Sequence, residues 1–136
     1  MKNNKKGFTL IELLVVIAII GLLSTLAVVA LNNARQKSRD ARRVSDIKQI
    51  QTALELSYND NNAYPATVAT GGNIGEYMST VPSNPDPRTD GGCADADYVY
   101  AALASNTSYT LTYCLGATTG GIIGGTPQTA TPAGIQ

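Results

Sequence analysis

The sequence predicts an α+β fold in which one long N-terminal helix, transmembrane in its first half and amphipathic in its second, packs on a small antiparallel β-sheet head. Three observations support this prediction: a 24-residue apolar run at residues 8–31, a helical apolar pattern that continues to about residue 58, and two alternating segments rich in Tyr, Thr and Val near the C-terminus. With 136 residues, the chain has room for one small domain.

The apolar run is long enough to cross a membrane. Nineteen of its 24 residues are apolar and only Glu12 is charged. At about 1.5 Å per residue it reaches roughly 36 Å, against a hydrocarbon core of ~30 Å. A secretory signal peptide is one alternative, with residues 28–30 as a small-residue cleavage site, but its apolar core is usually only about 7–15 residues long. A plain membrane anchor is another, but it gives Glu12 no role.

Glu12 is the one charge in this run, and its carboxylate costs about 2.5–3.5 kcal/mol near the centre of a spanning helix. Either it lies close enough to the interface to reach water, or it finds a positive partner. The run itself contains no Lys or Arg. A cut between Gly7 and Phe8 would create an α-amino group four residues before Glu12, and that amine is the natural counter-charge.

Residues 5–12, with the sequence KKGFTLIE, resemble the class III signal of type IV pilins and pseudopilins. The shared pattern is a short basic leader, Gly before the cut, Phe after it and Glu as the fifth mature residue. The resemblance implies a leader peptide at residues 1–7, cleavage by a prepilin peptidase between Gly7 and Phe8, and N-methylation of Phe8. It also implies that Glu12 guides assembly by pairing with the Phe8 amine of an adjacent subunit.

The same resemblance predicts the localisation of the chain and its binding partners. It implies a single-pass protein of the inner or plasma membrane that an inner-membrane assembly platform builds into a homo-oligomeric helical filament, extracellular or periplasmic. The distribution of positive charge points the other way, because three Lys precede the apolar run and five basic residues follow it: Arg35, Lys37, Arg39, Arg42 and Arg43. We follow the motif, which places the leader in the cytoplasm and the head outside.

The helix is expected to continue as an amphipathic half over residues 32–60. Its apolar residues recur at spacings of three, four or seven: Ala34, Ala41, Val44, Ile47, Ile50, Leu54 and Tyr58. A cluster of Asn and Asp at residues 59–62, followed by Pro65, ends the pattern. The apolar stripe is expected to pack against the chain's own head, and a coiled-coil seam is the weaker alternative.

Residues 35–48 carry six positive and two negative charges. One interpretation is a solvated helix face outside the membrane. Another is that basic residues such as Arg42 and Arg43 meet acidic residues on neighbouring heads in a filament. Nucleic-acid binding is not expected, because no aromatic stacking residues accompany the charges.

The globular head is assigned to residues 61–115. Loops dominate residues 63–96, with one short helix expected at residues 73–80. Residues 97–103 and 109–115 are expected to form an antiparallel hairpin, whose buried face carries Tyr109, Leu111 and Tyr113. Residues 116–136 hold six of the thirteen glycines and are expected to be a flexible surface tail.

Cys93 and Cys114 are the only cysteines, and both lie in the part expected outside the cytoplasm. A disulfide between them suits an oxidising compartment and would tie the loop region to the last predicted strand. Two free buried thiols are the alternative.

Calcium binding is one interpretation of the aspartates in the loop region. Asp86, Asp90, Asp95 and Asp97 supply the oxygen ligands that this ion needs. However, Arg88 stands where another ligand would be wanted, and no bidentate Glu follows. The better interpretation is that these aspartates stabilise turns of the backbone, so no cofactor and no metal site is predicted. Asn106 begins a glycosylation sequon, a short pattern that recurs by chance.

These patterns predict a structural subunit of a type IV pilus-like filament and not an enzyme. The chain has no His and only two Cys, which excludes Ser-His-Asp triads, Cys-His pairs and His-ligated or four-thiolate zinc sites. The first alternative is a major pseudopilin of a type II secretion system, which the proline-free apolar run resembles. The second is a monomeric membrane-anchored binding module, which again leaves Glu12 without a role.

Overall fold

The computed structural model describes residues 7–135. The basic residues of the predicted leader, Lys2, Lys5 and Lys6, therefore lie outside the described part. The chain divides into two structural units, of which the first ends at Arg35 and the second begins at Gln36. Each unit is described by itself.

Helix α1 (Leu10–Asn61) is the predicted long helix, and the first unit contains its apolar part. The large apolar side chains from Phe8 to Leu31 are all exposed, between 47% and 85%. By length and composition, α1 is the one helix among the described residues that could cross a membrane. The hydroxyls of Ser24 and Thr25 donate to the carbonyls of Ile20 and Leu22 at 2.7 and 2.8 Å, so these polar groups are satisfied within the helix itself.

At its other end, α1 ends at Asn61, within the Asn- and Asp-rich cluster that was predicted to end it. Asn62 adopts a left-handed conformation with φ 52°, which breaks the helix. Its backbone N–H donates to the Tyr58 carbonyl at 2.7 Å and closes the last turn.

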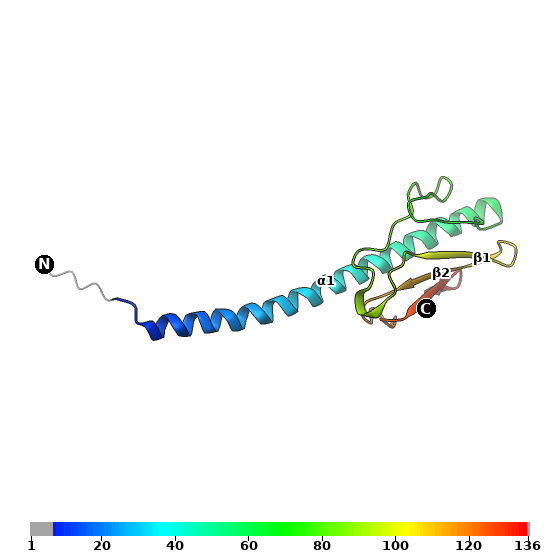
Figure 1. Cartoon of the computed structure of the whole chain (residues 1–136). Coiled ribbons are helices and arrows are strands. Elements are labelled where there is room, and N and C mark those ends of the chain that lie inside the picture. Colours follow the sequence, from blue (N-terminus) through cyan, green and yellow to red (C-terminus); the bar gives the residue numbers. More distant parts are fainter. Residues whose placement is uncertain (1–6, 136) are drawn as a thin grey trace. The chain divides into compact units, whose positions relative to one another are not determined.

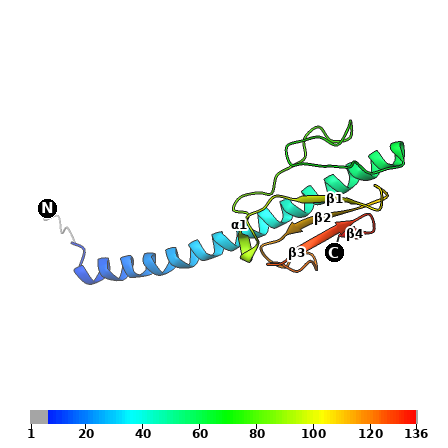
Figure 2. The ribbon, with the colours of Figure 1, turned by 45° about the vertical axis from the view of Figure 1, so that its right-hand side comes forward.

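The second unit holds a four-stranded antiparallel sheet with the strand order β1-β2-β3-β4. The strands are β1 (Val99–Leu103), β2 (Ser108–Cys114), β3 (Pro127–Thr131) and β4 (Gly134–Ile135). The predicted hairpin is present, with Ala101 opposite Thr110. Figures 1 and 2 show this sheet beside the C-terminal part of α1. The α+β fold class is therefore confirmed.

The core of this unit lies between α1 and the sheet. From α1 it takes Ile47, Ile50 and Leu54, all fully buried. From β2 it takes the predicted face: Tyr109, Leu111 and Tyr113, each at most 3% exposed. Three aromatic contacts extend the core, with the rings of Tyr58 and Tyr64, Tyr64 and Tyr109, and Tyr109 and Tyr100 packed at centroid distances of 4.6, 4.8 and 5.8 Å.

The expectation of a flexible tail at residues 116–136 is wrong for the residues that the structure describes. β3 pairs with β2, placing Ala130 opposite Leu111, and Ala130 is fully buried. Glycines of this segment adopt turn conformations, as at Gly120 and Gly125, or allow close approaches between loop residues. Gly124 is an example, since a Cβ there would lie 2.3 Å from the Ala117 carbonyl carbon.

The short helix expected at residues 73–80 is also absent. Ile74 and Met78 form an isolated antiparallel bridge instead, with the Ile74 N–H donating to the Met78 carbonyl at 2.9 Å. Gly75 lies between them with φ 51°, a turn conformation that interrupts a helix. Ile74 is buried in the core, so tertiary packing decides this segment.

Candidate functional site

Two sites follow from these elements: the N-terminus of α1, and the place where the head binds α1. At the first, Thr9 is the N-cap and Glu12 is the third helical residue, so the two form a capping box. The Thr9 backbone N–H and hydroxyl both donate to Glu12 Oε2, at 2.8 and 2.6 Å. The Glu12 N–H in turn donates to the Thr9 hydroxyl at 3.3 Å.

The capping box gives Glu12 a partner that the sequence interpretation missed. Its carboxylate lies at the positive end of the helix dipole and is held by one neutral residue. Both hydrogen bonds use Oε2, which leaves Oε1 without a hydrogen-bond partner among residues 7–135. Phe8, immediately before the cap, is 85% exposed. A T-x-x-E pattern just before an apolar run is a recognised helix start and could have been found from the sequence.

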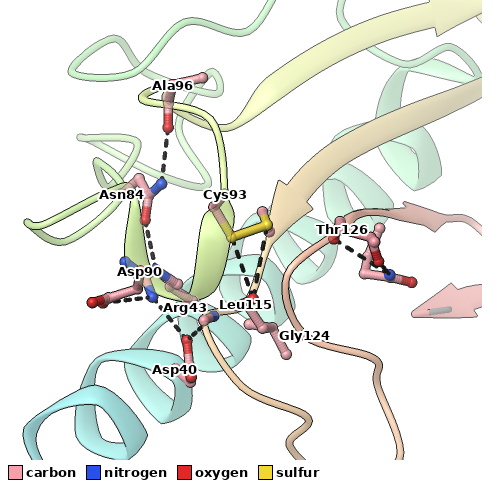
Figure 3. Close-up of a disulfide and its surroundings, with 12 residues drawn as sticks. Asp40, Arg43, Asn84, Asp90, Cys93, Ala96, Leu115, Gly124 and Thr126 are labelled. Carbon is pink, nitrogen blue, oxygen red and sulfur yellow. Dashed lines mark hydrogen bonds and ion pairs between the residues drawn. A yellow bond between two sulfur atoms is a disulfide. The ribbon is translucent and has the colours of Figure 1, made fainter.

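The second site is built around Arg43, whose side chain is fully buried. Figure 3 shows Arg43 between Asp40, Asn84 and Asp90. Its guanidinium donates to five oxygens, each within 3.2 Å: Asp40 Oδ1, Asn84 Oδ1, Asp90 Oδ2 and the carbonyls of Pro85 and Pro87. A buried charge is tolerated when it is paired and hydrogen-bonded in this way.

Two neighbours on α1 complete this cluster. Arg39 binds Asp90 through two parallel hydrogen bonds of 2.6 and 2.8 Å. Asp40, fully buried, accepts the backbone N–H groups of Gly116 and Ala117 at 2.8 and 2.9 Å. We call the neck clamp the three helix residues Arg39, Asp40 and Arg43 together with the segments that bind them, residues 84–93 and 114–117.

Two glycines allow these segments to approach each other closely, and a disulfide links them. A Cβ at Gly91 would lie 1.7 Å from the Gly116 carbonyl oxygen, and one at Gly116 would lie 2.6 Å from Asp90 Cβ. The segments are therefore packed too closely for any side chain at either position. Beside them, Cys93 and Cys114 form the predicted disulfide, with their Cα atoms 5.9 Å apart.

The neck clamp corrects the interpretation of the basic residues. Arg43 is fully buried and the Arg39 side chain is 23% exposed, and both bind Asp90 of their own chain instead of an acidic residue on a neighbouring head. The predicted apolar stripe is also wrong at its start, since Ala34 and Ala41 are exposed. Polar residues take its place where the head begins. Arg42 is exposed, and the structure neither assigns it a partner chain nor excludes one.

The four aspartates weighed for calcium are used differently. Asp90 is bound by Arg39 and Arg43, while Asp86 and Asp97 lie 3.5 and 3.3 Å from Arg88. Asp97 also accepts the backbone N–H of Asn84 at 2.8 Å. Asp95 is exposed. Within residues 7–135, no group of three or more His, Cys, Asp or Glu side chains is arranged to hold a metal ion.

The pKa values of two carboxyl groups in the second unit are shifted in opposite directions. The hydrogen bonds from Arg39, with the charge of Arg43, lower the pKa of Asp90 despite its burial. Burial raises the pKa of Asp46, and the hydrogen bond from the Tyr98 hydroxyl, 3.1 Å long, partly offsets this. Asp90 is therefore a charged partner in the clamp, whereas Asp46 is a carboxyl that burial disfavours in its charged form.

The fold and the N-terminal segment are those of a pilin-type protein, with one helix long and apolar enough to cross a membrane. A profile of the prokaryotic N-terminal methylation motif matches residues 2–28. Type II secretion system core protein G of Aeromonas hydrophila is 37% identical over 93 residues, covering 67% of this chain and 63% of the relative. The same protein of Vibrio cholerae is 37% identical over 91 residues, covering 65% and 59%. The chain is thus a homologue of core protein G, and the predicted resemblance is confirmed.

A fimbrial protein is also among the relatives. The type IV major fimbrial protein FimA of Dichelobacter nodosus is 46% identical over 60 residues, covering 44% of this chain and 38% of the relative. The chain spans less than two thirds of the length of each of these three relatives. No solved structure matches the chain.

Removing the buried cation should break the neck clamp. Arg43→Met leaves Asp40 and Asp90 without their shared partner, and we expect the free energy of unfolding to fall by about 3–5 kcal/mol. Urea titration of the full chain in detergent, followed by tyrosine near-UV circular dichroism, measures this, because all seven tyrosines lie after residue 57. Arg42→Met, at an exposed site, is the matched control and should change it by no more than about 0.5 kcal/mol. Equal effects of the two variants would contradict a dominant role for Arg43.

Acid should weaken the clamp through Asp90. Because its folded pKa is lowered, Asp90 adds stability that is complete above the unfolded pKa of about 3.9 and is lost as pH falls through the folded pKa. The free energy of unfolding of Asp90→Asn should therefore fall less than that of the native chain between pH 5 and pH 2. Asp86→Asn changes a side chain that is 85% exposed and should keep the native dependence. Identical acid profiles for all three proteins would disprove this assignment.

Proposed function

We propose that the chain is the structural subunit of a type IV pilus-like filament, of the major pseudopilin type found in type II secretion systems, and that it is not an enzyme. The main observation behind the proposal is the length of the region that aligns with core protein G. An alignment of 93 residues must extend into the head, because α1 ends at residue 61. The similarity to the fimbrial protein covers only 60 residues and does not require the head.

In this proposal the chain is first stored as a single-pass membrane protein, with the apolar half of α1 in the lipid. The methylation motif at residues 2–28 includes the proposed cleavage point between Gly7 and Phe8 and the proposed methylation site at Phe8. Gly7 precedes α1, lies outside any regular element and is exposed, as a peptidase substrate requires. Cleavage there by a prepilin peptidase would leave the new amine on Phe8, next to the capping box.

Assembly would move this segment from lipid into a bundle of helices from other copies. Glu12 Oε2 is already used by Thr9, so Oε1 is the oxygen that would accept the Phe8 amine of an adjacent subunit. A charge-assisted hydrogen bond of this kind gains strength where water is excluded. The capping box would hold the carboxylate at the helix terminus until that neighbour arrives.

Intact-mass analysis of the filament subunit tests processing and assembly together. The expected native subunit begins at Phe8 and is heavier by one methyl group. Glu12→Gln keeps the shape of the side chain and removes its charge, so we expect cleavage to proceed while sedimentable filament is lost. Thr9→Ser keeps the capping hydroxyl and is the matched control, expected to assemble. A mature chain that retains residues 1–7, or a Glu12→Gln subunit that assembles normally, would overturn the scheme.

A pilus subunit is the second candidate, favoured by the similarity to the fimbrial protein. The phenotype of a strain that lacks this protein distinguishes the two candidates. A major pseudopilin predicts that an exported enzyme accumulates in the periplasm while surface filaments are unchanged. A pilus subunit predicts loss of filaments by electron microscopy with export intact. If neither phenotype appears, both candidates fail and the membrane-anchored binding module gains support.

A further inference from the structure

The disulfide joins the two head segments that bind buried charges on α1. Asp90, which binds Arg39 and Arg43, opens the short 3-10 helix Asp90–Gly92, and the N–H of Cys93 donates to its carbonyl at 3.2 Å. On the other side, Cys114 ends β2, and the N–H groups that bind Asp40 follow directly at residues 116 and 117. One covalent bond thus connects the acceptor of the arginines with the donors of the buried aspartate.

Both segments must be in place for the charges to stay buried. Asp40 and Arg43 are each fully buried, and their partners other than each other lie in residues 84–90 and 116–117. Removing either segment would leave a buried charge short of partners, which is strongly unfavourable. Closing the disulfide brings the two segments together and so favours the closed clamp.

We propose that Cys93–Cys114 is a redox latch on the neck clamp: the head engages residues 39–43 of α1 fully only once this disulfide has formed. The inference goes beyond the proposed function, because it concerns a step in the maturation of the subunit. The partner that closes the latch is a protein disulfide, acting by thiol–disulfide exchange.

In the closed clamp, Cys93 is 7% exposed, whereas Cys114 is partly exposed on the outer face of β2. A small cleft of about 80 Å³ lies beside it, lined by Ala94, Val99, Thr112, Cys114, Pro127 and Asn84. Asn84 also accepts the Arg43 Nε–H at 2.8 Å, so the cleft adjoins the clamp itself. Figure 3 shows the disulfide next to Asn84 and Asp90.

The exchange balances without any other reactant. The thiolate of one cysteine attacks one sulfur of the partner's disulfide, forming a mixed disulfide and releasing one partner thiolate. The thiolate of the other cysteine then attacks the chain's sulfur in the mixed disulfide, forming the Cys93–Cys114 bond and releasing the second partner thiolate. The chain is oxidised by two electrons, the partner is reduced by two, and the two protons of the cysteine thiols end on the partner's thiols.

The latch differs from a disulfide that merely stabilises the whole head. Ile50, Leu54 and Leu111 are each at most 1% exposed, and the apolar cluster to which they belong contains neither cysteine. Five residue pairs join β1 to β2. Opening the disulfide should therefore release the clamp segments and leave the core closed. The opened state would present Arg39 and Arg43 without their partners from the head.

Hydrogen–deuterium exchange on the full chain in detergent tests this. In Cys93→Ser/Cys114→Ser, we expect exchange at residues 36–43, 84–93 and 114–125 to accelerate at least about tenfold, with residues 47–57 and 108–113 changing by less than about twofold. Arg43→Met with the disulfide intact should open the same segments, and adding the cysteine changes should have little further effect. Uniform acceleration across the head, or no change at residues 84–93, would overturn the latch. Hydrogen–deuterium exchange does not depend on filament assembly, so failure of the latch and failure of the proposed function are distinguishable.

Discussion

The buried guanidinium of Arg43 governs how the head is attached to α1. One of its five acceptors lies on the helix and four lie in the loop at residues 84–90, so directional hydrogen bonds tie that loop to α1 at four points. The apolar contacts around Ile47 and Ile50 give the attachment its area, but apolar contacts are not directional. The ion cluster therefore sets the register in which the head meets the helix, while the core supplies the greater part of the burial.

Local patterns account for what the sequence could predict. The apolar run, the β1–β2 hairpin and the end of α1 at its Asn-rich cluster each depend on a few neighbouring residues. β3 was missed because its pairing with β2 spans a glycine-rich segment that looks like a tail in isolation. The clamp was missed because a sequence shows that charges exist and not which of them meet. Asp40 and Arg43, three residues apart on a helix, were its only local sign.

Glu12 and Arg43 differ in how their charges are partnered. Arg43 is neutralised within its own chain, by carboxylates and carbonyls that surround it completely. Glu12 receives only neutral donors from Thr9 and keeps one oxygen without a partner among the described residues. The first arrangement is complete in one subunit and specifies its fold. The second is incomplete in one subunit, which is the property expected of a group that recognises another copy.

The clamp residues also continue a polar stretch that begins directly after the apolar run. Residues 32–38 contain Arg35 and Lys37 together with Asn, Gln and Ser, so the run ends at Leu31 whatever stands at residues 39–43. Arg39, Asp40 and Arg43 keep this stretch polar while the head is unfolded. Once the head has folded, Asp40 and Arg43 are fully buried, Arg39 is 23% exposed, and all three are paired, so this polar stretch leaves the folded subunit no unpaired buried charge. A disulfide that closes only outside the cytoplasm would place that change after insertion.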